Sequence, residues 1–307
     1  MNRKKWWKIA LPFIIAVKIA LIIFIIGSAK PEAPQVLTEP VETMEFKSVE
    51  IPDKIVFAGE EFSIDRFDYI ESLDRELLSN VYFHSQTIRF IKMAPRYFSV
   101  IEPILRENGV PEDFKYLALA ESGFNPRAVS PAQAVGLWQF IKSAAQQYGL
   151  EVGKEVDERY HVEKSTVAAC KYLKEAYAKF GNWPLVAASY NAGLTGVSRH
   201  LERQKADSYF DLLLTDETAR YFYRIVALKL ILENPEKYNF YIPESEKYPI
   251  IKTRDVEVSG PVPNFADFAK EHGISYKLLK DFNPWLRETF LTNPTGKKYV
   301  IKIPVLK

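Results

Sequence analysis

Residues 111–140 read PEDFKYLALAESGFNPRAVSPAQAVGLWQF, and this stretch decides the fold that the sequence predicts. Its first part has the features of a short helix. Pro111 suits the first helical turn, where its missing N–H breaks no hydrogen bond, and the acidic residues after it suit the positive end of the helix dipole. Gly123 suits the exit, because glycine readily adopts the left-handed conformation that ends many helices.

One face of this helix carries a carboxylate. Phe114, Leu117, Ala118 and Glu121 follow the spacing of one helix face, and the first three are apolar, so this face should pack inward. Burial and the negative end of the helix dipole both disfavour a charged carboxylate, so we expect a raised pKa for Glu121. A carboxyl group that is still protonated near neutral pH can act as a general acid. In the structural alternative, Glu121 caps a neighbour or pairs with an arginine.

Residues 122–140 are poor as regular structure, because turn formers and small residues alternate with apolar ones. We expect an ordered loop along the wall of a cleft, with Ser130 and Gln139 among its isolated polar groups. Trp138 offers an aromatic face of the kind on which sugar rings stack. Packing in the core is the alternative for this tryptophan.

A second segment, residues 183–193, reads WPLVAASYNAG. It predicts a helix that is apolar nearly all round and therefore central. The helix ends in Tyr190 and Asn191, just before a glycine. Polar groups at the end of a buried helix either cap it or line a cavity, and the sequence leaves both possibilities open for Asn191.

A third segment, residues 215–224, reads TDETARYFYR. Its first three residues predict a helix start, and this is the simpler interpretation of Glu217. Tyr221 lies one to two turns into this helix and is the more interesting residue.

The composition excludes several classes of protein. Of 307 residues, 47% are hydrophobic and 26% charged, as in an ordinary globular chain, and a formal net charge of +2 is too balanced for a nucleic-acid-binding protein. The single cysteine, Cys170, excludes a disulfide within this chain, and the four histidines lack metal-ligand spacing. We therefore expect no metal, no other cofactor and no nucleic-acid partner.

Residues 1–28 predict an association with a membrane. A basic cluster and two tryptophans precede an apolar run from residue 9 to 27, interrupted by Pro12 and Lys18, which suffices to cross a hydrocarbon core of ~30 Å. The segment is either an uncleaved transmembrane anchor or a signal peptide cleaved near Gly27-Ser28-Ala29. In both interpretations, the rest of the chain is exported from the cytoplasm.

The next two stretches, residues 29–64 and 65–242, differ in composition and periodicity. Residues 29–64 are rich in proline and acidic residues and predict an extended tether. Residues 65–242 carry helical patterns, punctuated by prolines and glycines such as Pro95, with little strand alternation. We predict a compact, nearly all-α domain there, so that the protein as a whole is mostly α.

Residues 250–307 form a separate small module in this interpretation. Residues 256–258 are a strand candidate, residues 265–286 look helical with a break near Gly273, and residues 298–304 alternate like a strand. The predicted order is β-α-α-β.

Taken together, these segments resemble the soluble-lytic-transglycosylase (SLT) family. The run from Glu121 to Phe140 is similar to its first signature, residues 190–193 match its Tyr-Asn-Ala-Gly element, and Glu217-Thr218 with Tyr221 looks like its third element. The resemblance covers about residues 65–240, and the helical lead-in is similar to the membrane-bound D type of murein transglycosylase. It implies a lysozyme-like α fold.

The resemblance also implies roles for the matching residues. Glu121 would be the single catalytic acid/base, and Tyr190 would hold or orient Glu121 and the substrate. Further polar side chains would line the cleft: Ser130 and Gln139 near the scissile sugar, Asn191 in the wall and Tyr221 beside it.

The implied reaction breaks the bond between N-acetylmuramic acid and N-acetylglucosamine in peptidoglycan without water. Glu121 would protonate the glycosidic oxygen and then take the proton of the muramyl 6-hydroxyl as it attacks C1, giving a 1,6-anhydro sugar. Most glycoside hydrolases need two carboxylates, whereas the two best-matching segments hold one, and the substrate's acetamido group would replace the second. The alternatives are a goose-type lysozyme, which hydrolyses the same bond, and a non-catalytic peptidoglycan-binding scaffold.

The C-terminal module resembles a LysM domain, a binder of glycans that contain N-acetylglucosamine. The resemblance rests on Ile274-Ser275, Leu278, Asn283-Pro284, Leu286 and the closing strand, while residues 260–263 (GPVP) replace the usual Gly-Asp-Thr-Leu opening. The expected partners are peptidoglycan glycan strands and, through the N-terminal helix, a membrane. We expect the protein in the cell envelope, on the periplasmic side of the inner membrane.

Overall fold

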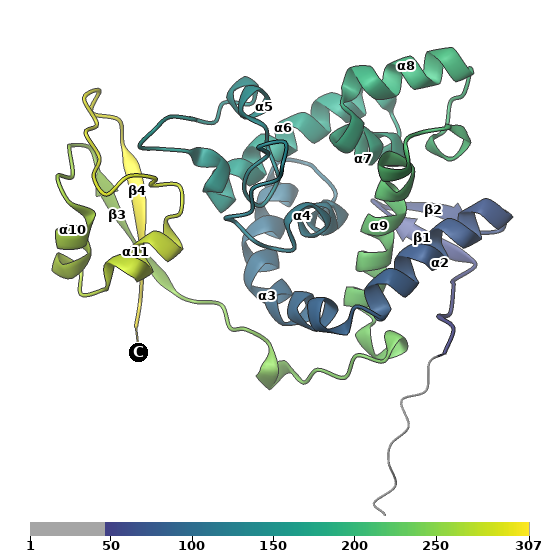
Figure 1. Ribbon diagram of the computed structural model, residues 1–307, viewed down its shortest axis with the longest axis horizontal. Helices are drawn as coiled ribbons and strands as arrows, with labels where there is room; N and C mark the ends of the chain where they lie inside the picture. Colours follow the sequence, from purple (N-terminus) through teal and green to yellow (C-terminus); the bar gives the residue numbers. More distant parts are fainter. Residues whose placement is uncertain (1–46, 307) are drawn as a thin grey trace, which may run out of the picture. The chain divides into compact units, whose positions relative to one another are not determined.

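A computed structural model describes residues 47–306, and helices dominate it (Figure 1). The predicted anchor, residues 1–28, lies outside the described residues, as do residues 29–46 of the predicted tether. Between residues 47 and 306, no helix has the length and apolar character needed to span a membrane.

The helices and strands are, in chain order, β1 (Lys54–Phe57), β2 (Glu60–Ser63), α2 (Phe67–Val81), α3 (His84–Glu107), α4 (Lys115–Ser122), α5 (Lys142–Gln147), α6 (Val162–Phe180), α7 (Trp183–Ala192), α8 (Leu194–Gln204), α9 (Asp216–Glu233), β3 (Thr253–Val258), α10 (Phe265–Glu271), α11 (Tyr276–Phe282) and β4 (Tyr299–Pro304). Short 3-10 turns occur at Glu112–Phe114, Glu158–Tyr160, Tyr209–Asp211, Pro235–Tyr238 and Glu244–Glu246.

Helix α4 occupies the centre of the helical part, with α3 and α9 packed against it (Figure 1). The prediction of its end is confirmed, because Gly123 adopts a left-handed φ of 58° and its N–H bonds to the carbonyl of Leu119. Pro111 lies outside α4, because it directly precedes the 3-10 turn Glu112–Phe114 that leads into this helix. The expected apolar face is buried, and so are Tyr116 and Leu119 on the other sides. The helix is therefore enclosed almost all round.

Helix α3 contradicts the expectation that Pro95 interrupts the helical pattern. It runs from His84 to Glu107 with Pro95 and Pro103 inside it. A proline in a helix interior costs about 3 kcal/mol through a lost hydrogen bond and a steric clash. The packing of α3 against α2, α4 and α6 outweighs this local preference.

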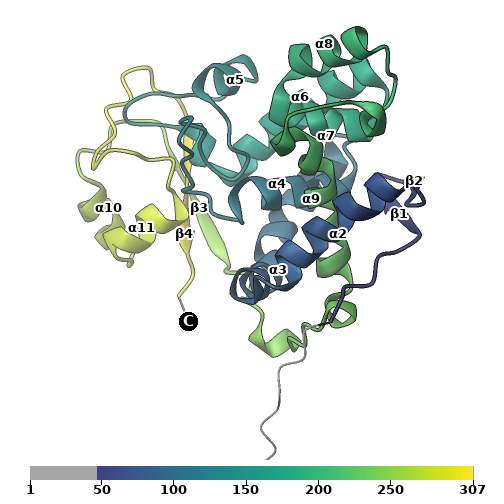
Figure 2. The same cartoon turned by 45° about the vertical axis from the view of Figure 1, so that its right-hand side comes forward.

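The prediction of an extended tether is wrong for residues 54–63, which form the antiparallel hairpin β1–β2 beside α2 (Figure 2). Ile55 and Phe57 are 1% and 0% exposed, and the Phe57 ring packs edge-on against Phe114 and Phe222. The two turn residues, Ala58 and Gly59, both have positive φ, as a tight hairpin requires. The hairpin thus adds two buried side chains to the helical core.

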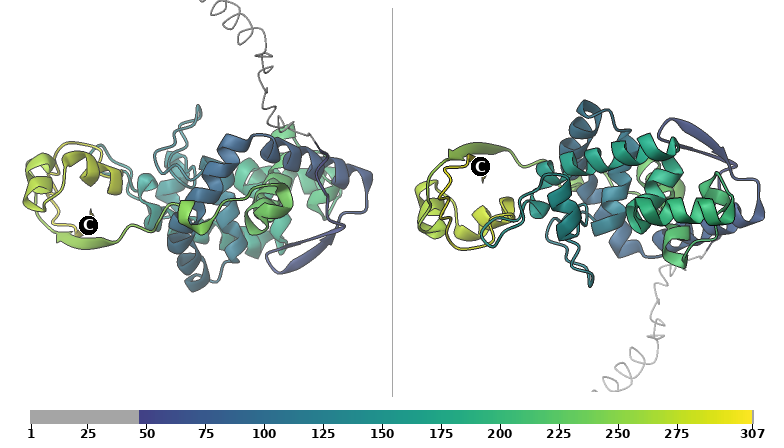
Figure 3. Two further views of the ribbon diagram at one scale, coloured as in Figure 1. Left: turned by 90° about the horizontal axis from the view of Figure 1, so that it is seen from below. Right: turned by 90° about the horizontal axis from the view of Figure 1, so that it is seen from above.

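The C-terminal module has the predicted β-α-α-β order. Strands β3 and β4 pair antiparallel from Thr253↔Pro304 to Val258↔Tyr299, and α10 and α11 lie on one side of this pair (Figure 3). The side chains of Asn264 and Ser275 cap the two helices, and Gly273 marks the break between them with a φ of 75°.

The module shares a buried cluster with residues of the helical part. Val135, Val156 and Tyr160 belong to the same apolar cluster as Trp285 and Leu286. Backbone hydrogen bonds join the two segments, from Asp157 N–H to the Trp285 carbonyl (2.9 Å) and from Arg287 N–H to the Glu155 carbonyl (2.8 Å). Ion pairs add to this contact: Lys297 pairs with Glu151 and Glu158, and Lys154 pairs with Glu288. Residues 150–161 are therefore held by the module as well as by the helical part.

Replacement of Leu286 by alanine tests this shared cluster. Leu286 is 0% exposed, and such a truncation costs about 2–5 kcal/mol of unfolding free energy. We expect that loss in urea denaturation, together with faster amide hydrogen exchange in residues 150–161. The control is Val300→Ala, at a strand position that is 43% exposed. Unchanged exchange in residues 150–161 would contradict a supporting role of the module.

Candidate active site

One cavity of about 590 Å³ brings together most of the residues that the sequence singled out. It lies where the end of α4, the end of α7 and the start of α9 meet the loop after α4. The predicted residues that line it are Glu121, Ser130, Gln139, Tyr190, Asn191 and Tyr221.

Glu121 is partly buried in this cavity and accepts a hydrogen bond from the hydroxyl of Tyr221. Burial raises the pKa of Glu121 to about 7, the hydrogen bond from Tyr221 opposes this rise, and the nearby charge of Glu217 adds to it. Glu121 has no ion pair within residues 47–306, which argues against the structural alternative of an arginine partner. Its pKa suits a group that gives and takes a proton near neutral pH.

Burial also raises the pKa of Tyr221 well above its ordinary value. The phenol therefore stays protonated and remains a hydrogen-bond donor to Glu121. A donor stabilises the charged carboxylate more than the neutral acid, so Tyr221 limits how far burial can shift the pKa of Glu121.

The loop between α4 and α5 contains three strained residues, one of which, Gln139, lines the cavity. Phe124, Gln133 and Gln139 all have positive φ, which is uncommon for residues other than glycine. The Gln139 side-chain amide donates to the carbonyl of Gly136 (2.8 Å), and the Ser130 hydroxyl accepts the N–H of Ala134 (3.1 Å). Both polar side chains thus stabilise the loop that presents them.

Tyr190 has a different partner from the one that the resemblance implied. Its hydroxyl donates to the carbonyl of Trp138 (2.8 Å), so Tyr190 fixes the loop, whereas Tyr221 is the residue that bonds Glu121. The expectation that Trp138 stacks on a sugar is contradicted, because Trp138 is 0% exposed and its indole N–H donates to Thr166 (2.9 Å). The core-packing alternative for Trp138 holds.

Asn191 connects the cavity to the start of α9. Its amide donates to a Glu217 carboxylate oxygen (3.0 Å), and its oxygen accepts the hydroxyl proton of Thr218 (2.7 Å). The predicted helix start is confirmed, since α9 begins at Asp216. Glu217 nevertheless also lines the cavity, a role that its sequence pattern alone did not predict. The sequence signal that could have identified this role is the position of Glu217 in the third element of the family, beside Tyr221.

Gly136 allows the loop to approach the segment that the C-terminal module supports. Its φ is 84°, and an added Cβ would lie 2.0 Å from the carbonyl oxygen of Arg159. We expect Gly136→Ala to lower the free energy of unfolding by about 1–3 kcal/mol, because the backbone must shift. Gly260→Ala is the matched control, since nothing lies within 4 Å of its Cβ position. Equal melting temperatures for the two variants would contradict a close approach of Gly136 to Arg159.

The raised pKa of Glu121 also predicts how stability depends on pH. Between the ordinary pKa of 4.5 and about 7, the folded state binds more protons than the unfolded state, so stability falls as the pH rises through this window. Glu121→Gln removes the ionisable group, and with it the loss of stability that a buried, charged carboxylate causes at higher pH. We expect it to raise the free energy of unfolding at about pH 8 by at most about 3 kcal/mol, with little change at about pH 4.

Urea denaturation at both pH values measures this effect. The matched control is Glu107→Gln, an exposed carboxyl at the end of α3. An identical pH profile for the two variants would show that Glu121 titrates like a solvated carboxyl group.

Comparisons with known proteins agree with this architecture. The profile of the transglycosylase SLT domain matches residues 98–212, and that of the soluble lytic transglycosylase C-terminal LysM-like domain matches residues 254–307. Over 257 residues the chain is 31% identical to the membrane-bound lytic murein transglycosylase D of Escherichia coli K12, covering 81% of this chain and 55% of that protein. The same figures hold for the protein from Escherichia coli O6:H1.

The chain thus spans about half the length of the curated relatives that it matches. Among solved structures, the 70 kDa soluble lytic transglycosylase of Escherichia coli matches with a TM-score of 0.40 and 20% identity, over 48% of this chain and 26% of that chain. The two domain profiles and the sequence identity to the curated relatives show that the chain carries an SLT transglycosylase domain and a LysM-like C-terminal domain, and is homologous to membrane-bound lytic murein transglycosylase D.

Proposed function

We propose that this protein is a peptidoglycan lytic transglycosylase that uses Glu121 as its single general acid/base. The observation that carries the proposal is the Glu121 carboxyl group, with a pKa of about 7 and a hydrogen bond from Tyr221, in the cavity of an SLT domain. The substrate would be the bond between N-acetylmuramic acid and N-acetylglucosamine, and the product a 1,6-anhydro sugar.

The same carboxyl group serves both proton transfers. Protonated Glu121 gives its proton to the glycosidic oxygen as the bond to C1 breaks, and the substrate's acetamido group supports C1. The carboxylate of Glu121 then takes the proton of the muramyl 6-hydroxyl as its oxygen bonds to C1. Glu121 ends protonated, no water is consumed, and Tyr221 stabilises the carboxylate between the two steps by its hydrogen bond.

Glu217 gives one specific reason to keep the hydrolase alternative. Its carboxylate lines the same cavity as Glu121 and is oriented by the Asn191 amide. A pair of carboxylates is what most glycoside hydrolases use, one as acid and one as base or nucleophile. If Glu217 activated water, the protein would act as a lysozyme on the same bond.

We also propose a cell-envelope location, on the periplasmic side of the inner membrane, with residues 1–28 as anchor or signal peptide. The homology to a membrane-bound lytic murein transglycosylase supports this proposal. The LysM-like module would contribute binding to the glycan strands. The domain borders at residues 65–242 and 250–307 stay predictions.

Mass spectrometry of the fragments that the protein releases from purified peptidoglycan sacculi tests the reaction. We expect muropeptides lighter by one water molecule than hydrolysis products, and Glu121→Gln should lower their release by about 100-fold or more. Glu217→Gln is the matched carboxyl-to-amide variant and should leave the anhydro product in place.

The other outcomes separate the alternatives. Products with ordinary reducing ends that disappear in Glu217→Gln would make the protein a hydrolase. Undiminished release by Glu121→Gln would end the single-acid proposal. Binding to sacculi without any release would favour the scaffold.

A further inference from the structure

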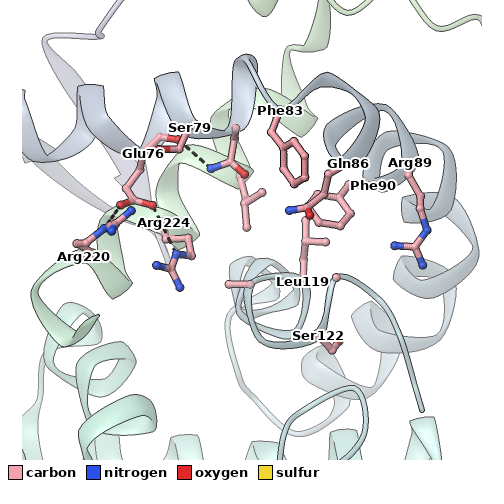
Figure 4. A pocket seen from close by; sticks show the side chains of 14 residues that line it. Glu76, Ser79, Phe83, Gln86, Arg89, Phe90, Leu119, Ser122, Arg220 and Arg224 are labelled. Carbon is pink, nitrogen blue, oxygen red and sulfur yellow. Dashed lines mark hydrogen bonds and ion pairs between the residues drawn. The ribbon is translucent and has the colours of Figure 1, made fainter. Parts of the chain in front are cut away.

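A second cavity, of about 440 Å³, adjoins the end of α4 (Figure 4). Its walls come from α2, the first turns of α3, and α9. Leu119 and Ser122 at the end of α4, and Gly123 directly after it, complete the lining. We call it the arginine pocket, because Arg89, Arg220 and Arg224 line it.

The charges in the arginine pocket do not balance. Glu76 is the one acidic residue among its lining residues, and it is buried. Its carboxylate oxygens lie 2.6 Å from Nε of Arg220 and 3.5 Å from Nε of Arg224 (Figure 4). Glu76 thus fixes two guanidinium groups on one wall, and a positive charge remains in excess.

The opposite wall offers donors that lack a partner. Within residues 47–306, Arg89 has no ion pair or hydrogen bond, and neither does the side-chain amide of Gln86. Phe83, which is 55% exposed, adds apolar surface to the same wall (Figure 4). Such a combination suits a ligand that has a carboxylate on an aliphatic stem, since a guanidinium group can bind a carboxylate through two parallel hydrogen bonds.

The arginine pocket adjoins the catalytic cavity directly. Ala120 and Arg224 line both cavities, and Glu121 follows Ala120 in the chain. A group that branches from a glycan strand beside Glu121 therefore has only a short distance to cross.

We propose that the arginine pocket binds a carboxylate of the peptide carried by the muramyl residue next to the bond that is cleaved. This inference rests on the proposed function, because peptidoglycan is the substrate whose sugars bear carboxylate-rich peptides. Arg89 and Gln86 on one wall, and Arg220 on the other, contact the peptide. Glu76 positions Arg220 and Arg224.

Cleavage of two matched substrates tests this assignment. Glycan strands that retain their peptides are compared with strands from which an amidase has removed them. Arg89→Ala lowers kcat/KM about tenfold on the peptide-bearing strands, the effect of one charged hydrogen bond, and leaves it unchanged on the bare strands. Arg106→Ala is the control, since Arg106 on α3 pairs with Glu112 and does not line the pocket.

Equal losses on the two substrates, or no loss on either, would overturn the assignment. A direct measurement keeps it testable if the protein cleaves neither substrate. A stem tripeptide that ends in diaminopimelate is titrated into the full-length protein and followed by the NMR signals of the Arg89 and Gln86 side chains. Saturable shifts of the Gln86 amide signals that Arg89→Ala abolishes and Arg106→Ala preserves support the pocket, and unaltered signals refute it whatever the fate of the proposed function.

Discussion

The partial burial of one carboxyl group, Glu121, is the constraint on which the rest of the site depends. Helix α4 is enclosed by α3 and α9, and it ends at Gly123, so that Glu121 enters the cavity from a rigid and largely dry support. The hydrogen bond from Tyr221 offsets part of the rise in the pKa of Glu121 that burial causes, so both protonation states of this carboxyl group remain accessible. A fully apolar surrounding would trap the neutral acid, and a solvated one would leave only the carboxylate.

The loop that faces Glu121 is strained and needs support from two sides. Tyr190 bonds it from the helical core, through the carbonyl of Trp138, and Gly136 rests against Arg159 on the other side. The Arg159 segment is itself packed into the C-terminal module through Val156 and Tyr160. The module therefore belongs to the chain of contacts that fixes the cleft wall, in addition to any binding of glycan.

Local patterns in the sequence were sufficient to predict the helices and strands whose ends and faces are determined by neighbouring residues. The exits of α4 and α7 at glycines, the start of α9 and the β-α-α-β order of the module all follow from capping residues and periodicity. The hairpin β1–β2 was missed because proline-rich composition masked two buried side chains whose partners lie on distant helices. The hydrogen bonds of Tyr190 to Trp138 and of Tyr221 to Glu121, and the burial of Trp138, depend on tertiary packing that no spacing encodes.

The two cavities at the end of α4 are linked electrostatically through Arg224. Its positive charge favours the ionised form of Glu121 and so lowers the pKa of that carboxyl, while Glu76 neutralises part of the charge. A carboxylate that entered the arginine pocket would neutralise more of the Arg224 charge. The electrostatic stabilisation of ionised Glu121 by Arg224 would then be weaker. The pKa of the acid would then rise when a peptide-bearing strand is bound, so a larger share of the bound enzyme would hold the proton that the first step requires. Substrate recognition and proton supply would thus depend on the same guanidinium group.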